Sequence, residues 1–418
     1  MPQYPRLKIL VSAYACEPGK GSEPGVGWNW VSQISKCNDV WVITRSNNRQ
    51  YIEEALSSSP MPSVHWIFFD LASWALFWKK KRRGIHLYYY IWQLGAYWHA
   101  RQLHRKVKFD LVHHVTLVIY WMPSCLSLLR APFVWGPVGG GDSIRFSLWR
   151  NLSWRGKLYE TLRTVAQWIS GSDPFLRFTA RRAVLALATT RQTLRKLEAL
   201  GCRNVQLYSQ VALPESEIAQ LGSTAMRDDH PFRLISIGML VHLKGFDFSL
   251  KAFAQFSDRL PESEYWIIGE GPERSRLQAL ARDLGVTRQV TFWGALPRTE
   301  VLRKLVECDV MIHPALHDSG GWASLEGMAA GLPVIGLDAG GTALQLTDET
   351  GIKVPAFSPE QLVRDLTMAI KRLAKDRDLR LRLGQGAKQR VKNQFNWDEK
   401  GRAISELYRQ TLGSASPS

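Results

Sequence analysis

A glycine pair flanked by two carboxylates is the feature of this 418-residue chain best suited to chemistry. Gly320 and Gly321 precede a predicted helix, and free N–H groups at the positive end of a helix dipole bind phosphate well. Asp318 precedes the pair, and Glu326 follows eight positions after Asp318. Because helical side chains lean toward the N-terminus, the Glu326 carboxylate can point back to a ligand and accept hydrogen bonds from sugar hydroxyls. The alternative is a helix cap with one solvated glutamate.

Alternating strands and helices are predicted to position this element. The apolar run at residues 310–312 indicates a buried strand, and the helix from about Trp322 should end at Gly331 and Pro333. Further strands are predicted at residues 232–238, 290–296 and 334–337, and residues 264–272 are predicted to form a strand with a glycine turn; helices lie between them. Such alternation predicts a parallel sheet covered on both faces.

The first half of the chain starts with the same pattern. A strand at residues 7–12 precedes a glycine-rich loop at residues 16–28 and then a helix to about residue 35. The loop is either a contact for a substrate phosphate or sugar, or a simple connection. The strand at residues 109–114 ends in His113 and His114, where a histidine faces a ligand or packs in the core. Further strands are predicted at residues 40–44 and 65–69. Residues 133–142 are predicted to form another strand with a glycine-rich exit, a second candidate loop, and a helical region follows from 145 to 210.

The charge balance indicates an anionic partner. The chain carries 54 Lys and Arg against 37 Asp and Glu, a net charge of +17. Nucleic acid, an acidic membrane surface and phosphorylated substrates all fit such a charge. Thirteen of the 17 tryptophans lie in the first 180 residues, and residues 74–83 combine aromatic residues with five consecutive cations. This segment, followed by further aromatic residues at 88–98, is interpreted as an interfacial membrane anchor, with a solvated basic turn as the alternative.

The five cysteines are scattered and include no Cys-x-x-Cys pair, so neither a zinc site nor a disulfide framework is expected. A reducing cytoplasm fits this usage. No N-terminal signal peptide and no membrane-spanning run of about 18 apolar residues is expected.

Five ordered elements between residues 238 and 341 resemble family 4 of the GT-B retaining glycosyltransferases. They are Gly-x-Leu-x-x-x-Lys-Gly-Phe at 238–246, Ile-Ile-Gly-Glu-Gly-Pro at 267–272, Phe-Trp-Gly-Ala-Leu at 292–296, the carboxylate pair at 318 and 326, and Met-Ala-Ala-Gly-Leu-Pro-Val-Ile at 328–335. Residues 15–28 resemble a subset found in bacterial exopolysaccharide gene clusters.

The resemblance implies an α/β chain with two Rossmann-like domains whose parallel sheets face a central cleft. Residues 1–213 would form the acceptor- and membrane-side domain, and residues 214–231 the linker. Residues 232–397 would bind the nucleotide-sugar donor, and a C-terminal helix at about 398–416 would pack back onto the first domain.

The resemblance also implies roles for individual residues. Lys244 would bind the donor diphosphate, Glu326 the ribose hydroxyls, and Asp318 would lie near the transferred sugar, with His114 close to the sugar-facing histidine of the family. The donor-binding positions would be Gly21, Met239, Gly269, Leu296, Gly320, Gly321, Trp322 and Leu325. Three positions depart from the family: Met239 replaces an arginine, Asp318 replaces a glutamate, and the family's histidine falls at Val115. The cation missing at 239 would come from Arg298 or another basic side chain.

The function implied is retaining transfer of a hexose from a UDP- or GDP-sugar to a glycan or polyprenyl-pyrophosphate-linked acceptor in bacterial surface polysaccharide synthesis. No metal is expected, and no cofactor, because the nucleotide sugar is a substrate. The protein is expected in the cytoplasm, peripheral on the inner face of an anionic membrane. One alternative is a relative that binds nucleotide without turnover. Another is a basic nucleic-acid-binding protein, but the aromatic residues do not follow an RNA-binding strand pattern, so no nucleic acid partner is expected.

Overall fold

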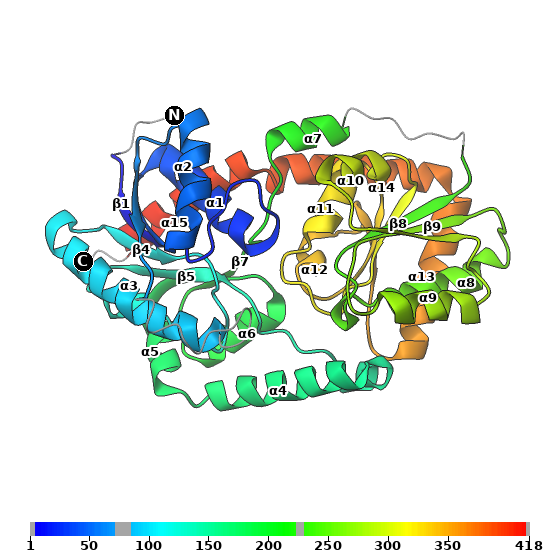
Figure 1. Ribbon diagram of the computed structural model, residues 1–418, viewed down its shortest axis with the longest axis horizontal. Helices are drawn as coiled ribbons and strands as arrows, with labels where there is room; N and C mark the ends of the chain where they lie inside the picture. Colours follow the sequence, from blue (N-terminus) through cyan, green and yellow to red (C-terminus); the bar gives the residue numbers. More distant parts are fainter. Residues whose placement is uncertain (1–4, 72–84, 223–229, 415–418) are drawn as a thin grey trace. The chain divides into compact units, whose positions relative to one another are not determined.

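A computed structural model describes residues 5–71, 85–222 and 230–414 of the chain (Figure 1). The chain forms two compact units. The first comprises Met1–Gly141, Ala166–Gln210 and Asp398–Ser418, and the second comprises Asp142–Val165 and Val211–Trp397. The chain therefore enters the second unit with residues 142–165, before the first unit is complete, and returns to the first unit at its C-terminal end.

The first unit is built on a parallel sheet of seven strands in the order β3-β2-β1-β4-β5-β6-β7. The strands are β1 (Lys8–Ser12), β2 (Asp39–Thr44), β3 (Val64–Phe68), β4 (Leu111–His114), β5 (Phe133–Val138), β6 (Ala183–Ala188) and β7 (Val205–Leu207). Its helices are α1 (Ser22–Cys37), α2 (Arg49–Ser58), α3 (Ile85–Val107), α5 (Pro174–Arg182), α6 (Arg191–Ala199) and α15 (Trp397–Ser414). Helix α4 (Trp154–Ser170) is shared, since its residues 154–165 belong to the second unit and residues 166–170 to the first.

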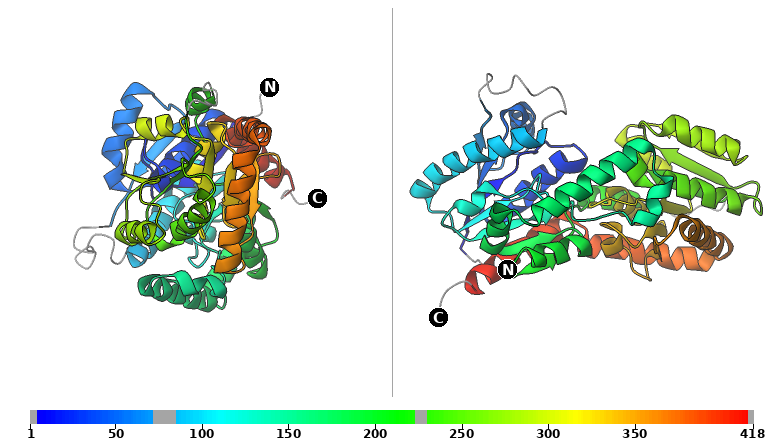
Figure 2. Two further views of the ribbon diagram at one scale, coloured as in Figure 1. Left: turned by 90° about the vertical axis from the view of Figure 1, so that its right-hand side faces the viewer. Right: turned by 90° about the horizontal axis from the view of Figure 1, so that it is seen from below.

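The second unit is built on a parallel sheet of six strands in the order β10-β9-β8-β11-β12-β13. The strands are β8 (Arg233–Ile237), β9 (Glu264–Ile268), β10 (Val290–Gly294), β11 (Val310–His313), β12 (Val334–Leu337) and β13 (Gly351–Val354). Its helices are α7 (Glu215–Gly222), α8 (Phe246–Ser257), α9 (Arg274–Asp283), α10 (Arg298–Leu305), α11 (Trp322–Ala329), α12 (Thr342–Gln345), α13 (Pro359–Lys375) and α14 (Arg377–Gln394), of which α13 and α14 are orange in Figure 2.

The prediction of two α/β domains with parallel sheets is confirmed, and the strands β8 to β12 lie where apolar runs predicted them. Strand β13 was not predicted. Strands β6 and β7 lie inside the region expected to be helical, because burial in the sheet overrides the helix preference of the alanine-rich run at 183–188. Helix α7 occupies part of the segment expected to be the linker, residues 214–231.

The glycine-rich loop predicted at residues 16–28 is shorter than expected. Helix α1 begins at Ser22, so residues 22–28 are helical, and Pro24 is tolerated because it lies in the first turn. A Cβ atom at Gly27 would lie 2.0 Å from the carbonyl oxygen of Ala15. The glycine at 27 therefore serves close packing of α1 on the loop before it.

The aromatic residues that follow the basic segment are mostly core residues. Tyr88, Tyr89 and Trp92 are buried in the apolar cluster of the first unit, whereas Trp98 is 58% exposed. The predicted membrane anchor at residues 74–83 lies outside the described residues. Within the described ranges, no helix combines the length and apolarity needed to cross a bilayer.

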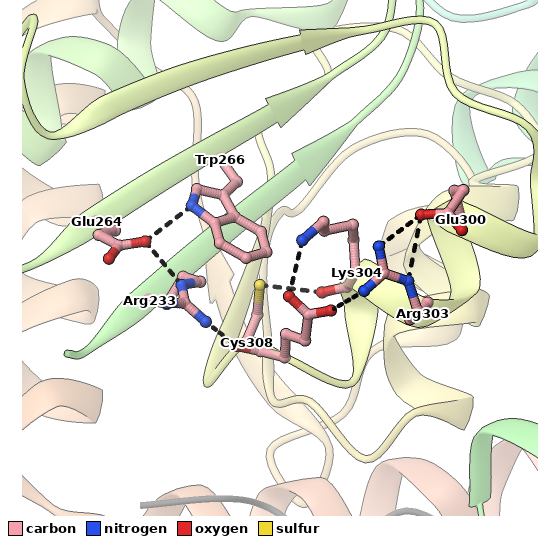
Figure 3. Close-up of polar contacts among 8 residues, drawn as sticks. Arg233, Glu264, Trp266, Glu300, Arg303, Lys304 and Cys308 are labelled. Atoms are coloured by element: carbon pink, nitrogen blue, oxygen red, sulfur yellow. Dashed lines mark hydrogen bonds and ion pairs between the residues drawn. The ribbon is translucent and has the colours of Figure 1, made fainter. Parts of the chain in front are cut away.

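Some of the positive charge is neutralised inside the second unit (Figure 3). The Trp266 ring lies between the Arg233 guanidinium at 4.1 Å and the Lys304 ammonium at 4.4 Å. Glu264 accepts hydrogen bonds from Arg233 and from the Trp266 indole, and Glu307 accepts one from Lys304 at 2.8 Å. These two cations are matched by two carboxylates, so the cluster holds strands and α10 together and contributes nothing to the net charge of +17.

Candidate functional site

Lys244 is positioned by a tight turn after β8. A short 3-10 helix (His242–Lys244) ends at Gly245, which has a φ of 64° and precedes α8. A Cβ atom at Gly245 would lie 2.2 Å from the carbonyl oxygen of Pro314, and the N–H of Leu316 donates to the carbonyl of Leu243 at 2.9 Å. The turn after β8 therefore packs directly on the loop after β11, and only glycine fits at 245.

One carboxylate oxygen of Asp318 contacts two side chains, those of Lys244 and His313. Lys244 Nζ forms an ion pair with Asp318 Oδ2, and His313 Nε2 lies 3.2 Å from the same oxygen. Burial alone would raise the pKa of Asp318, but the charge of Lys244 and the hydrogen bond from His313 outweigh it and hold this pKa well below its usual range. Asp318 is therefore ionised in the folded chain.

The other oxygen of Asp318 organises the glycine pair. Oδ1 accepts from the N–H of Gly320 at 3.2 Å and from the N–H of Gly321 at 3.1 Å. We expected these N–H groups to face sugar and phosphate; in the structure they are bonded to Asp318 instead. Gly321 has a φ of 62° and precedes α11, and the Gln345 side chain donates to the carbonyl of Gly320 at 2.7 Å.

Glu326 is buried in α11 and pairs with a different cation. Its Oε1 lies 2.5 Å from Nη1 of Arg298, and Nη2 of Arg298 lies 2.6 Å from Oε2 of Glu217. Burial raises the pKa of Glu326, and the Arg298 charge opposes this rise. Arg298, which we considered as the replacement for the cation missing at 239, thus bridges two carboxylates of the second unit.

Two ion pairs of the second unit therefore have their carboxylates on one continuous segment, residues 318–326. Lys244 meets Asp318 in the loop before α11, and Glu326 meets Arg298 along α11. The Lys244 side chain is 22% exposed, and an ammonium has three N–H donors, so donors remain for an anionic ligand beside Asp318.

Two predicted residues at the start of α11 differ in role: Trp322 offers a hydrogen-bond donor, whereas Leu325 belongs to the core. The indole N–H of Trp322 is buried and has no hydrogen-bond partner among the described residues. The Leu325 side chain is wholly buried in the core, so it does not line an open surface.

Glycines lie at the carboxyl ends of three neighbouring strands. Gly238 follows β8, Gly269 follows β9 and Gly294 ends β10. The N–H of Gly269 donates to the carbonyl of Gly294 at 2.8 Å, and a Cβ atom at Gly269 would lie 1.9 Å from the carbonyl oxygen of Gly238. Beside this edge Met239 is 55% exposed, and Leu296 is half-buried. Ligands of parallel α/β sheets bind at such carboxyl edges.

The remaining predicted residues belong to the first unit. His114 is buried; its Nε2 lies 2.5 Å from the Tyr89 hydroxyl and its Nδ1 lies 2.9 Å from the Ser124 hydroxyl. Burial lowers the pKa of His114 to about 4, so the ring is neutral. Both ring nitrogens are engaged, which matches the packing alternative for this residue. Gly21 immediately precedes α1, and a Cβ atom there would meet nothing within 4 Å.

Sequence reasoning missed three side chains that hold the loop. Besides His313 and Gln345, His317 accepts a hydrogen bond at Nε2 from Nη2 of Arg163, at 2.5 Å. Burial and the charge of Arg163 lower the pKa of His317 to about 3, so it is neutral and able to accept. The histidines at 313 and 317 both precede Asp318 closely in the sequence and were a usable signal, whereas nothing local marks Gln345. Across the described ranges, no group of three or more His, Cys, Asp or Glu residues could hold a metal ion.

Comparison with known proteins shows which family part of the chain is similar to. Residues 225–390 match the family described as "Glycosyl transferases group 1". The lipopolysaccharide core biosynthesis glycosyltransferase LpsE of Rhizobium meliloti (strain 1021) is 33% identical over 182 residues, which cover 43% of this chain and 49% of that protein. The chain spans between 35% and 49% of the length of the first curated relatives that it matches.

Solved structures resemble the chain over nearly its whole length. Sucrose-phosphate synthase from Thermosynechococcus elongatus has a TM-score of 0.64 at 18% identity, covering 98% of this chain and 100% of that one. Anabaena HepE, solved in complex with UDP and glucose, has a TM-score of 0.59 at 16% identity, covering 97% and 100%. At these identities the likeness concerns the fold, which is the two-domain GT-B architecture.

Proposed function

We propose that this chain, whose residues 225–390 match the group 1 glycosyl transferases, transfers a hexose from a nucleotide sugar. The observation that carries the proposal is the ion pair between Lys244 and Asp318, which lies in the loop before α11. Glu326 is buried within α11 itself. All three residues lie within the matched region. The complex of HepE with UDP and glucose supports a UDP-sugar as the first donor to test.

The chemistry requires a nucleoside diphosphate to leave an anomeric carbon. Negative charge grows on the β-phosphate as this bond breaks, so an ammonium held beside the phosphate lowers the barrier. Lys244 is that group: Asp318 orients its ammonium, and its remaining N–H donors are available to the diphosphate. The carboxylate of Asp318 is already occupied by four donors, so its role is to hold Lys244 and the loop.

Glu326 is proposed to bind the ribose hydroxyls. Its Oε1 is bonded to Arg298, and its second oxygen is the acceptor available to a hydroxyl group. Arg298 fixes the direction of the carboxylate, and Glu217 fixes Arg298 from the other side. Donor recognition thus rests on a chain of three charged residues in the second unit.

Transfer is proposed to retain the anomeric configuration. The acceptor hydroxyl would attack the face from which the diphosphate leaves, and a leaving phosphate oxygen would take its proton. This route needs no metal and no cofactor, since the nucleotide sugar is a substrate. Holding donor and acceptor together supplies much of the remaining rate advantage.

The acceptor is proposed to be a glycan carried on a lipid pyrophosphate at the inner face of the bacterial cytoplasmic membrane. The net charge of +17 supports attraction to an anionic membrane and to the acceptor pyrophosphate. LpsE, which acts in lipopolysaccharide core biosynthesis by its name, supports a role in surface polysaccharide synthesis.

A panel of nucleotide sugars tests the proposal. Ligand binding to the folded state raises the melting temperature, so UDP- and GDP-sugars should separate into stabilising and inert compounds. The stabilising donor, radiolabelled in its sugar, should then label a lipid fraction of bacterial membranes. Lys244→Ala and Glu326→Ala should abolish this labelling. Absence of any nucleotide-induced shift would contradict the proposal.

One specific residue favours a second candidate, a relative that binds nucleotide without turnover. Met239 occupies the position where the resembling family carries arginine, so one positive charge for the leaving diphosphate is absent. Sugar transfer measured with any acceptor would exclude this candidate, whereas nucleotide binding with neither transfer nor donor hydrolysis would support it.

A further inference from the structure

Helix α4 (Trp154–Ser170) has its apolar and polar sides reversed relative to an ordinary surface helix. At 100° per residue, Trp154, Leu158, Leu162, Val165, Trp168 and Ile169 share an arc of about 120°. This set, the outward face of α4, is exposed in the structure. Exposure reaches 69% at Trp154, 62% at Leu162 and 81% at Trp168.

The opposite side of α4 is polar and buried. Arg163 donates to Glu160 and to His317, and both charged side chains of this pair are almost wholly buried. Gln167 donates to the carbonyl of Gly140 at 2.7 Å and accepts from Lys196 at 2.7 Å. These bonds fix the rotation of the helix about its axis, so the apolar side points outward as a consequence of specific contacts.

The outward face is flanked by cations. On the helical wheel Arg155 and Lys157 lie at the two borders of the apolar arc, and both are exposed. From residue 145 to residue 210 the chain has twelve Lys and Arg against three Asp and Glu, a difference of 12 − 3 = +9.

We propose that the outward face of α4 inserts into the interfacial region of an anionic lipid bilayer, with the helix axis parallel to the membrane plane. Tryptophans near both ends of the helix suit the headgroup level, and lysine and arginine side chains at the borders reach lipid phosphates. A second copy of this chain is disfavoured because it would bring two strongly basic segments together. The 17 residues of α4 are too short and too polar on one side to span a bilayer.

This inference rests on the proposed function for its biological setting, because a lipid-linked acceptor is presented at the surface that α4 would enter. It also extends beyond the predicted anchor at residues 74–83, since α4 belongs to the described part of the chain. Its physical content, binding to lipid, does not depend on sugar transfer.

The test is co-sedimentation of the full chain with vesicles of phosphatidylcholine alone or mixed with an equal part of phosphatidylglycerol. The test variant combines Trp154→Gln, Leu162→Gln and Trp168→Gln, all on exposed side chains. The matched control combines Met368→Gln and Leu381→Gln, which are exposed apolar residues of α13 and α14. Burial of one large apolar side chain changes a binding constant by about tenfold, so the triple variant should bind mixed vesicles at least about tenfold more weakly than the wild type.

Wild-type and control chains should bind the mixed vesicles equally, and more weakly when phosphatidylglycerol is omitted or salt is raised. Equal binding by the triple variant and the wild type would overturn the inference. So would a wild-type dimer in light scattering that the triple variant no longer forms, since a second copy would then cover the face.

A parallel thermal-shift measurement with UDP and GDP separates this inference from the proposed function. The triple variant should keep the nucleotide-induced shift of the wild type. If the wild type binds vesicles but no nucleotide, the proposed function is refuted and membrane binding by the outward face of α4 is supported. If it binds nucleotide but no vesicles, membrane binding by the outward face of α4 is refuted and the proposed function is supported.

Discussion

Lys244 and Asp318 form an ion pair that joins the segments following two neighbouring strands, β8 and β11. The two residues are 74 positions apart in the sequence. Packing of Gly245 against Pro314 brings the backbones together, and the carboxylate then directs the ammonium. The site is therefore already organised before a donor is present.

Lys244→Ala should reduce sugar transfer by at least about 100-fold, because loss of one preorganised donor to a leaving group commonly costs this much. Asp318 would keep three of its four donors, so the fold should survive. Initial rates with the donor identified by thermal shift measure the effect, and Lys392→Ala, on an exposed lysine of α14, is the control. Near-normal transfer by Lys244→Ala would refute the role of this residue.

Arg298→Gln should destabilise the protein in a pH-dependent way. Without Arg298 the buried Glu326 carboxylate loses its cation, so its pKa, already raised by burial, should rise further. A carboxyl group with a raised folded pKa binds protons that the unfolded chain has released, so stability falls as pH rises. The melting temperature of the variant should therefore fall further below that of the wild type at about pH 8 than at about pH 5. A deficit independent of pH would contradict this account.

His317→Gln should reduce the loss of stability that the protein shows at acidic pH. The pKa of His317 is lowered to about 3, by burial first and by Arg163 second, whereas the unfolded histidine titrates near 6.5. As pH falls below about 6.5 the unfolded chain takes up a proton that the folded chain does not, so the wild type loses stability. Glutamine can accept from Arg163 without titrating. The melting temperature should therefore fall less in His317→Gln than in the wild type between about pH 7 and about pH 5. Parallel curves for the two proteins would rule out this contribution.

Gly321→Ala should cost more stability than Gly285→Ala. Both glycines have left-handed backbones, with φ values of 62° and 73°, so both substitutions carry a conformational cost of about 1 kcal/mol. A Cβ atom at Gly321 would also lie 2.7 Å from Oε1 of Gln345, whereas one at Gly285 would meet nothing within 4 Å. Chemical denaturation measures both costs. Only Gly321→Ala should also weaken nucleotide binding, since it displaces the start of α11; equal effects of the two variants would argue against this.

Met239→Arg should raise the rate of sugar transfer. The Met239 side chain is 55% exposed beside the glycine that follows β8, so a guanidinium can be accommodated there without displacing core residues. An added cation near the leaving diphosphate should stabilise its developing charge. The value of kcat for the tested donor is the measurement, and Met239→Gln controls for loss of the methionine. A slower Met239→Arg enzyme would show that another group already supplies this charge.

The strand and helix pattern of the second unit was readable from the sequence because apolar runs and glycine or proline stop signals are local. The glycine pair and the helix after it likewise predicted the position of Glu326, whereas Lys244 was singled out by the resemblance. The resemblance then implied their chemistry. Strands β6, β7 and β13 were missed, since their place in the sheet depends on pairing with other strands of the chain.

Which polar groups pair with one another could not be predicted from the sequence. Asp318 holds the glycine N–H groups expected for a ligand, Arg298 bridges Glu217 and Glu326, and His114 is enclosed by Tyr89 and Ser124. Each outcome depends on which polar groups long-range packing brings within hydrogen-bonding distance and removes from water. The orientation of α4 has the same origin: its sequence contains an apolar arc, but the buried bonds of Arg163 and Gln167 turn that arc outward.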